Sequence, residues 1–98
     1  QQAGAEVLYA PGLRAAGDIH SVITSVDRPV NVLTVPGAPP VAELVQLGVA
    51  RISVGGAFNQ VATAALIQAG RELLERGTYG FLDLAAEGRR QAAAAFTA

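Results

Sequence analysis

Short apolar runs rich in β-favouring residues alternate with longer segments of helical periodicity along this chain. The three runs are residues 6–10, 30–35 and 51–54. Each is too short for a typical helix and is followed by apolar residues spaced three and four positions apart, as on one face of a helix. The pattern therefore predicts strands that alternate with helices.

The first two helical segments have recognisable apolar stripes. In the first, the stripe consists of Ile19, Val22, Ile23 and Val26. In the second, it consists of Val41, Leu44 and Val45. Pro39-Pro40 suit the start of this second helix, and Gly48 suits the position just after its end.

Two further helices follow the third apolar run. The longer one has its stripe at Val61, Ala65, Leu66, Ala69 and Leu73. Gly77 comes directly after Glu75-Arg76 and is typical of a helix end. A last helix is predicted over about residues 83–96, with Asp83 as its N-cap.

The predicted order is β-α-β-α-β-α-α, which favours a parallel sheet with right-handed crossovers. The three βα units are expected at about residues 5–27, 28–48 and 49–77, followed by the C-terminal helix. We interpret residues 1–98 as part of one α/β domain, a partial (β/α)8 TIM barrel.

The two faces of the predicted sheet differ in polarity. Alternate strand residues point to opposite faces, and one set is almost wholly aliphatic, which predicts a face covered by helices. The other set mixes apolar residues with Tyr9, Asn31, Arg51 and Ser53. A mixed face of this kind suits a barrel interior. Three strands alone would leave it uncovered, so we expect the missing strands to come from elsewhere.

Composition excludes several classes of function. Hydrophobic residues make up 51% of the 98 residues and charged residues 15%, with a formal net charge of −1 and no Lys. We therefore expect no binding to nucleic acid or to an anionic membrane. The chain has no Cys, which excludes thiolate metal sites and disulfides. No uninterrupted apolar stretch is long enough to span a bilayer.

The ends of the sequence suggest a fragment. There is no Met anywhere, and the first four residues lack the charged and apolar regions of a signal peptide. We expect a cytoplasmic protein from which this chain is a piece.

Three passages resemble one known family. They are residues 4–13, 28–33 and 47–57, and residues 73–78 add the end of the long helix. Their order and spacing are similar to the last three strand units of the isocitrate lyase/phosphoenolpyruvate mutase superfamily, over about residues 4–82. The resemblance implies a Mg²⁺-dependent lyase or mutase acting on C–C or P–C bonds of small 2-oxo acids or related carboxylates. It also implies that the Mg²⁺ ligands lie on earlier strands, outside this segment.

One position departs from the family pattern. Several members carry a catalytic Glu or a substrate-contacting His where this chain has Pro11, which cannot act as an acid or a base. The resemblance therefore assigns no catalytic residue here, and the fragment alone is expected to be inactive. Pro11-Gly12 would line the rim at the strand end or would be a simple turn. Some lyases of the family place a substrate-contacting Asn near the position of Leu33.

Two more places could contact a substrate. Asn31 would bind a ligand through a network or would be a satisfied interior polar group, and the same alternatives hold for Tyr9 and Ser53. Gly55-Gly56 precede the long helix, where backbone N–H groups could receive a phosphate or carboxylate, or where glycines let the helix pack closely. The candidate substrate-binding residues are Pro11, Gly12, Asn31, Leu33, Gly55 and Gly56. We assign no metal ligand.

Partners and alternatives complete the interpretation. The resemblance implies a homo-oligomer in which the helix at about residues 57–76 packs on a neighbouring subunit. One alternative function is a phosphate-binding barrel of another family. Another is a non-catalytic half-barrel that associates with a second copy. His20 and the dispersed carboxylates are interpreted as surface groups.

Overall fold

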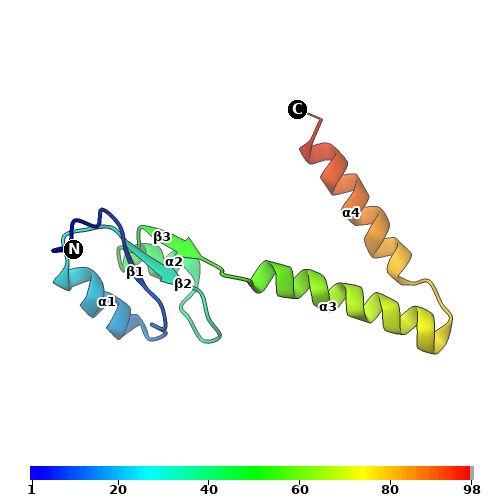
Figure 1. The fold of residues 1–98 in the computed structure, drawn as a ribbon, viewed down its shortest axis with the longest axis horizontal. Coiled ribbons are helices and arrows are strands. Elements are labelled where there is room, and N and C mark those ends of the chain that lie inside the picture. The colour runs from blue at the N-terminus through cyan, green and yellow to red at the C-terminus, as the bar shows by residue number, and fades with distance from the viewer. Residues whose placement is uncertain (98) are drawn as a thin grey trace. The chain divides into compact units, whose positions relative to one another are not determined.

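The computed structural model describes residues 1–97, which form two compact units, residues 1–57 and the residues from 58 onward. The elements of the first unit are β1(Leu8–Ala10), α1(Ala16–Ser25), β2(Val30–Leu33), α2(Val41–Gln46) and β3(Arg51–Ser53). The second unit contains α3(Ala57–Arg71) except its first residue, a π-helical turn η1(Glu72–Arg76) and α4(Phe81–Ala95) (Figure 1). This order confirms the predicted β-α-β-α-β-α-α pattern.

The three strands form one parallel sheet in the order β1-β2-β3. The register sets Tyr9 beside Asn31, and Asn31 beside Arg51. All three strands are shorter than the apolar runs that predicted them, which span residues 6–10, 30–35 and 51–54. The central strand β2 is the most buried of the three.

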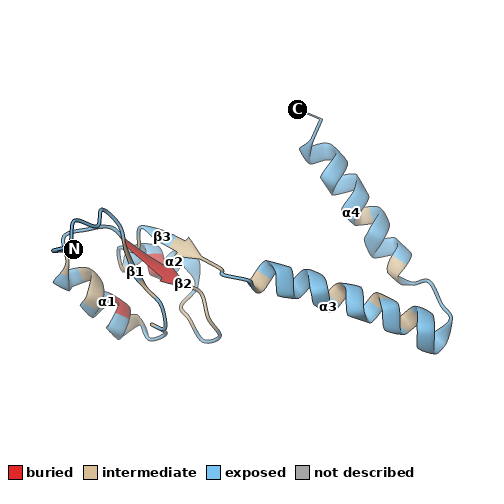
Figure 2. Cartoon of the chain, in the orientation of Figure 1, coloured by how far each residue is buried: buried red, intermediate tan, exposed pale blue. Residues whose placement is uncertain are grey.

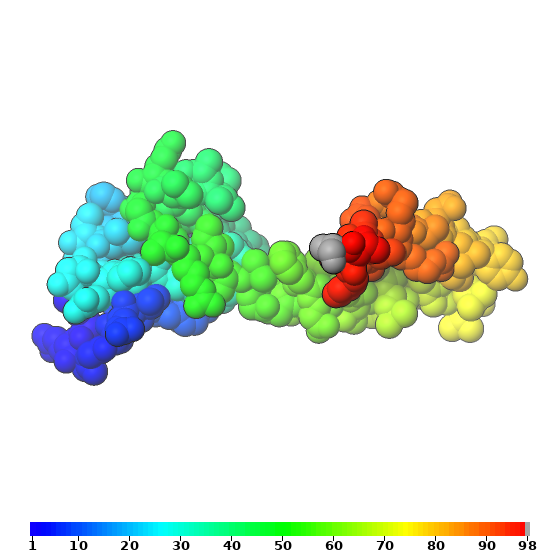
Figure 3. All heavy atoms as spheres, turned by 90° about the horizontal axis from the view of Figure 1, so that it is seen from above, coloured from blue at the N-terminus to red at the C-terminus, as the bar shows by residue number. Residues whose placement is uncertain are grey.

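The core lies on the aliphatic face of the sheet, under α1 and α2. Its fully buried members are Ile19, Val30, Val32 and Leu44. Figure 2 shows the buried residues of the first unit in α1, β2 and α2. In the space-filling view, residues 1–57 (blue to green) form a solid body (Figure 3). The prediction of a helix-covered aliphatic face is confirmed.

The predicted stripe of α2 was partly wrong. Leu44 is buried, but Val41 and Val45 are 61% and 64% exposed. The helix has only six residues, so few of its side chains can face the sheet. Leu44 does so, and half-buried Leu47 packs against the same core. Gly48 follows with φ +90, the left-handed conformation expected just after a helix end.

The second unit has no buried residue among those described. Helix α3 continues into the π-helical turn η1, and Gly77 ends it with φ +64, as the sequence predicted. The larger side chains of the predicted α3 stripe are exposed, with Val61 at 68% and Leu66 at 73%, whereas Ala65 and Ala69 are half-buried. Neither α3 nor α4 has a buried residue, and helices in proteins owe most of their stability to such packing.

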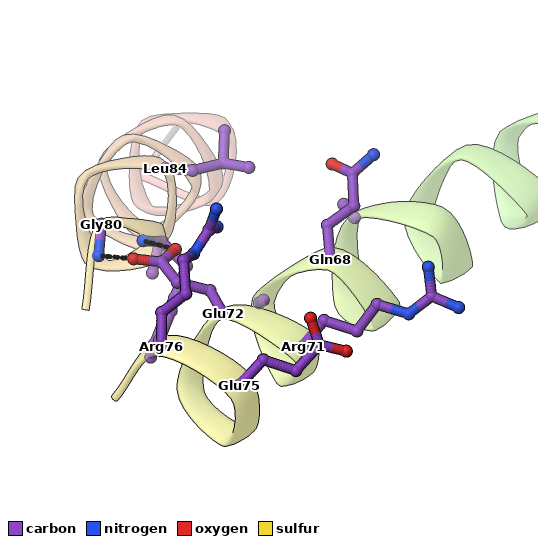
Figure 4. A pocket seen from close by; sticks show the side chains of 11 residues that line it. Gln68, Arg71, Glu72, Glu75, Arg76, Gly80 and Leu84 are labelled. Carbon is purple, nitrogen blue, oxygen red and sulfur yellow. Dashed lines mark hydrogen bonds between the residues drawn. The ribbon is translucent and has the colours of Figure 1, made fainter. Parts of the chain in front are cut away.

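The start of α4 differs from the prediction. The helix begins at Phe81, so Asp83 lies inside its first turn and is not the N-cap. Gly80 holds the cap position without a side-chain bond of its own, and the Glu72 carboxylate supplies the acceptors instead. It accepts a hydrogen bond from the Thr78 hydroxyl at 2.8 Å. It also accepts from the Gly80 N–H at 2.6 Å and the Phe81 N–H at 3.2 Å (Figure 4).

These hydrogen bonds make the start of α4 sensitive to pH. The Thr78 hydroxyl, then the Gly80 N–H, lower the pKa of Glu72 below its ordinary value of 4.5. A carboxyl with a lowered folded-state pKa stabilises the fold above its unfolded pKa and loses that effect as pH falls through the folded value. The contacts should therefore hold at neutral pH and weaken below about pH 4.5.

We expect Glu72→Gln to raise amide hydrogen exchange at Gly80 and Phe81 at pH 7, because the neutral amide offers one acceptor oxygen in place of two. Glu75→Gln, three residues further along the same π-helical turn, is the matched control. The Glu75 side chain makes no hydrogen bond within residues 1–97. Equal exchange in the two variants would contradict the capping role of Glu72.

Candidate functional site

The carboxyl ends of the three parallel strands meet at one edge of the sheet, and the predicted rim residues lie there. Pro11 and Gly12 form an exposed turn after β1, and Gly12 has φ +85. Leu33 ends β2 and is half-buried. Gly55 follows β3 with φ +56, and a Cβ at this position would lie 3.4 Å from Leu33 Cδ1. Leu33 and Gly55 are therefore in close contact.

A concavity of about 400 Å³ lies on the mixed face of the sheet. Its lining residues are Val7, Tyr9, Asn31, Arg51, Ser53 and Gly55. Of the six predicted candidates, only Asn31 and Gly55 are brought together here. Pro11, Gly12, Leu33 and Gly56 stay at the strand edge and do not line the concavity.

Asn31 is the most buried polar residue of this face, with 6% of its surface exposed. Its Nδ2 donates a hydrogen bond to Ser53 Oγ at 3.1 Å, and Ser53 Oγ donates to the Val32 carbonyl at 3.3 Å. Its Oδ1 is buried and has no hydrogen-bond partner among the described residues. The side-chain amide of Asn31 is therefore satisfied at Nδ2 and not at Oδ1.

Arg51 and Tyr9 flank Asn31 in the sheet register, one on each neighbouring strand. Arg51 is exposed and is the one ionisable cation in the lining of this concavity. The sequence reasoning did not select Arg51 as a site residue. The alternation of residues along the strands could have identified it, because this alternation places Arg51 on the same face of the sheet as Asn31. In the structure the two residues are paired on neighbouring strands.

The start of α3 has fewer free backbone N–H groups for binding an anion than Gly55-Gly56 suggested. The Ala57 N–H already donates to the Val54 carbonyl at 3.1 Å. Gly55-Gly56 therefore form a turn that closes onto the preceding strand. Anion binding at this helix start stays a prediction.

The acidic residues do not form a metal site. Within residues 1–97, no group of three or more His, Cys, Asp or Glu side chains is placed to hold a metal ion. The concavity itself has no carboxylate in its lining. The oxygen donors that Mg²⁺ prefers are therefore not gathered in this part of the chain.

A second hollow of about 710 Å³ lies inside the second unit, between α3 and α4. Its polar side chains include Gln68, Arg71, Glu72, Glu75 and Arg76, and Phe81 and Leu84 supply apolar ones (Figure 4). It contains none of the predicted site residues. No helix in residues 1–97 is long and apolar enough to cross a membrane.

A family model described as phosphoenolpyruvate phosphomutase matches residues 1–74, which is most of the chain. The chain belongs to the phosphoenolpyruvate phosphomutase family. The match includes all three strands and the whole of α3, so family membership rests on the same elements that carry the candidate site. A comparison with curated proteins finds no match.

Two solved structures are similar to this family member. A candidate lyase/mutase from Burkholderia cenocepacia J2315 is 43% identical with a TM-score of 0.82, and the match covers 91% of this chain and 33% of that one. A candidate phosphonomutase from the same organism is 38% identical with a TM-score of 0.67, over 79% of this chain and 29% of that one.

The chain thus spans about a third of the solved relatives that it matches. Three parallel βα units in an open sheet are a partial (β/α)8 barrel, as the alternation of strands and helices predicted. The sheet edges and the mixed face are the surfaces that further strands of a barrel would cover.

Proposed function

We propose that this chain forms part of the wall and rim of a lyase or mutase that acts on C–C or P–C bonds of small 2-oxo acids or related carboxylates. The observation that carries the proposal is the family match over residues 1–74, supported by 43% identity to a candidate lyase/mutase. The concavity on the mixed face has the size of a small-ligand site.

The residues of this chain are better suited to binding a substrate than to acting as catalytic acids or bases. Pro11 occupies the strand end where several family members carry an acid, a base or a substrate-contacting residue, and it has no ionisable group. The concavity offers a guanidinium, a phenol and an amide but no carboxylate or imidazole. We propose that the catalytic groups and the Mg²⁺ ligands are supplied by other strands, so that the isolated chain is inactive.

We also propose that the second unit docks on another surface of the assembled protein, with a second copy as the favoured partner. Phe58, Leu66, Leu74 and Leu84 are each at least 65% exposed. Apolar side chains exposed in such number are typical of interfaces. Association of copies without any effect of carboxylates would instead favour a non-catalytic half-barrel.

An activity screen tests the proposal. The full-length protein that contains this chain is incubated with 2-oxo acids, 2-hydroxy acids and phosphonates, with Mg²⁺ or with EDTA, and the products are identified by NMR. We expect cleavage or rearrangement with Mg²⁺ only, and none by the 98-residue chain alone. An inert full-length protein, or an active isolated chain, would contradict the proposal.

A further inference from the structure

We propose that Arg51 forms an ion pair inside the closed barrel with a carboxylate that a strand outside residues 1–98 supplies. The interaction surface is the mixed face of the sheet, and the partner is a barrel strand with an inward-facing Asp or Glu side chain. The inference goes beyond the proposed function, because it concerns how the barrel closes and not which reaction it catalyses. It requires only that the three strands belong to a (β/α)8 barrel.

Arg51 lies on the inner face of the wall at the amino end of its strand. It is the first residue of β3, and its side chain shares the mixed face with Ser53 and Gly55. Gly55 is four residues further on, at the carboxyl end, which is roughly 13 Å along an extended chain. Substrates of (β/α)8 enzymes bind at the carboxyl ends of the strands. Arg51 is therefore at the opposite end of the wall, where side chains contribute to stability.

No group within residues 1–97 neutralises the charge of Arg51. Its guanidinium makes no hydrogen bond there, and the ion pairs join Arg28 to Asp27 and Arg90 to Glu87. None of the residues that line the mixed face with Arg51 is acidic. A counter-charge must therefore come from outside the described part of the chain.

The nearest polar neighbour in the sheet does not replace a counter-charge. Asn31 pairs with Arg51 in the register of β2 and β3. Its Nδ2 donates to Ser53 Oγ, and its Oδ1 has no partner among the described residues, so it accepts nothing from the guanidinium. An amide is also neutral and cannot offset a full charge. All five N–H donors of the guanidinium are left for an acceptor on another strand.

Closure of the barrel makes an unpaired Arg51 costly. The residue is exposed in the open sheet of three strands, where water solvates it. In a closed barrel the inward side chains pack in layers, and the interior is not a water-filled pore. A charge buried there without a partner is strongly destabilising, and arginine cannot lose its proton to avoid that cost. A carboxylate fits best, because the planar guanidinium binds it through two hydrogen bonds.

Arg51→Met in the full-length protein tests the proposal, since methionine keeps an apolar stem and removes the charge. We expect the melting temperature at pH 8 to fall by at least about 5 °C, because the partner carboxylate is left buried and unpaired. Burial without a cation raises the pKa of that carboxyl group. The loss should therefore shrink to less than about half at pH 5, as a proton replaces the missing charge.

The pH dependence distinguishes an ion pair from simple packing of the arginine stem. Tyr9 and Arg51 are the titratable side chains that line the mixed face within residues 1–97, so no described carboxylate or imidazole can produce it. Arg89→Met is the matched control, because Arg89 is exposed on α4 and has no ion pair in the described residues. We expect it to change the melting temperature by less than about 2 °C at both pH values.

A loss below about 2 °C for Arg51→Met, or an equal loss at pH 5 and pH 8, would overturn the ion pair. If Arg51→Met does not fold, Arg51→Lys takes its place, because lysine keeps the charge without the planar fork. We expect Arg51→Lys to fold and to retain most of the wild-type stability. An Arg51→Lys variant that also fails to fold would overturn the proposal.

Double-mutant cycles locate the partner. Each Asp and Glu of the remaining strands is replaced by its amide, alone and together with Arg51→Met. At one position we expect the double variant to melt at a higher temperature than Arg51→Met alone, because no unpaired charge is then buried. Additive effects at every position would overturn the proposal. Melting temperatures are independent of turnover, so an inert full-length protein would contradict the proposed function and leave this ion pair standing.

Discussion

Replacing Leu44 by alanine is expected to lower the free energy of unfolding of residues 1–57 by about 2–4 kcal/mol, the usual effect of truncating a buried leucine. Leu44 is 1% exposed and is one of the four buried hydrophobic residues that form the core within residues 1–97. A core this small has few neighbours that can close the cavity. The measurement is urea unfolding followed by circular dichroism.

Val45→Ala is the matched control for this prediction, because Val45 is on the same helix, next to Leu44, and is 64% exposed. We expect it to change stability by less than about 0.5 kcal/mol. Equal effects at the two positions would mean that α2 does not pack on the sheet through Leu44, and the described core would be wrong.

Val32→Asp should have the largest effect of any single substitution in the first unit. Val32 is 2% exposed at the centre of the middle strand, in register with Ala10 and Ile52. A carboxylate there would be buried among aliphatic side chains without a partner, at a cost of about 3–5 kcal/mol or more. Because a small domain has little stability to lose, we expect no cooperative unfolding transition to remain.

Val7→Asp tests whether the loss of stability in Val32→Asp comes from the buried position or from the Val-to-Asp change itself. Val7 precedes β1 and is 52% exposed, so Val7→Asp should leave the unfolding transition in place. A cooperative transition that survives in Val32→Asp would contradict the placement of β2 at the centre of a buried layer.

The sheet and its core were predictable because they depend on short, repeating patterns. Strand parity separates Val30 and Val32 from Asn31, and the structure buries the aliphatic set under the helices. Gly48 and Gly77 were also predictable, since a left-handed residue after a helix end is a local requirement. These features need no information from distant residues.

The features that the sequence did not reveal depend on contacts between distant positions. The start of α4 is set by Glu72, eight residues before Gly80, while Asp83 has the residue type of an N-cap and lies in the first turn. The short length of α2 also decided which of its apolar residues pack on the sheet, and residue propensities do not determine the length of a helix.

The candidate site was predictable only in part. Parity placed Asn31, Tyr9, Arg51 and Ser53 on one face, but the unpaired Oδ1 appears only once the Ser53 hydroxyl is seen to donate to a carbonyl. The rim residues Pro11 and Gly12 lie at the strand edge and do not line the concavity. A rim is completed by neighbouring strands, so its final shape depends on residues beyond this sheet.

The central claim is that these three βα units are part of a larger barrel, and native mass spectrometry of the protein purified from its natural source tests it most directly. We expect this chain in a polypeptide or complex that also supplies the remaining strands, consistent with its coverage of 33% of the solved relative. A 98-residue chain present in its natural source without any polypeptide that supplies the remaining strands would contradict the account.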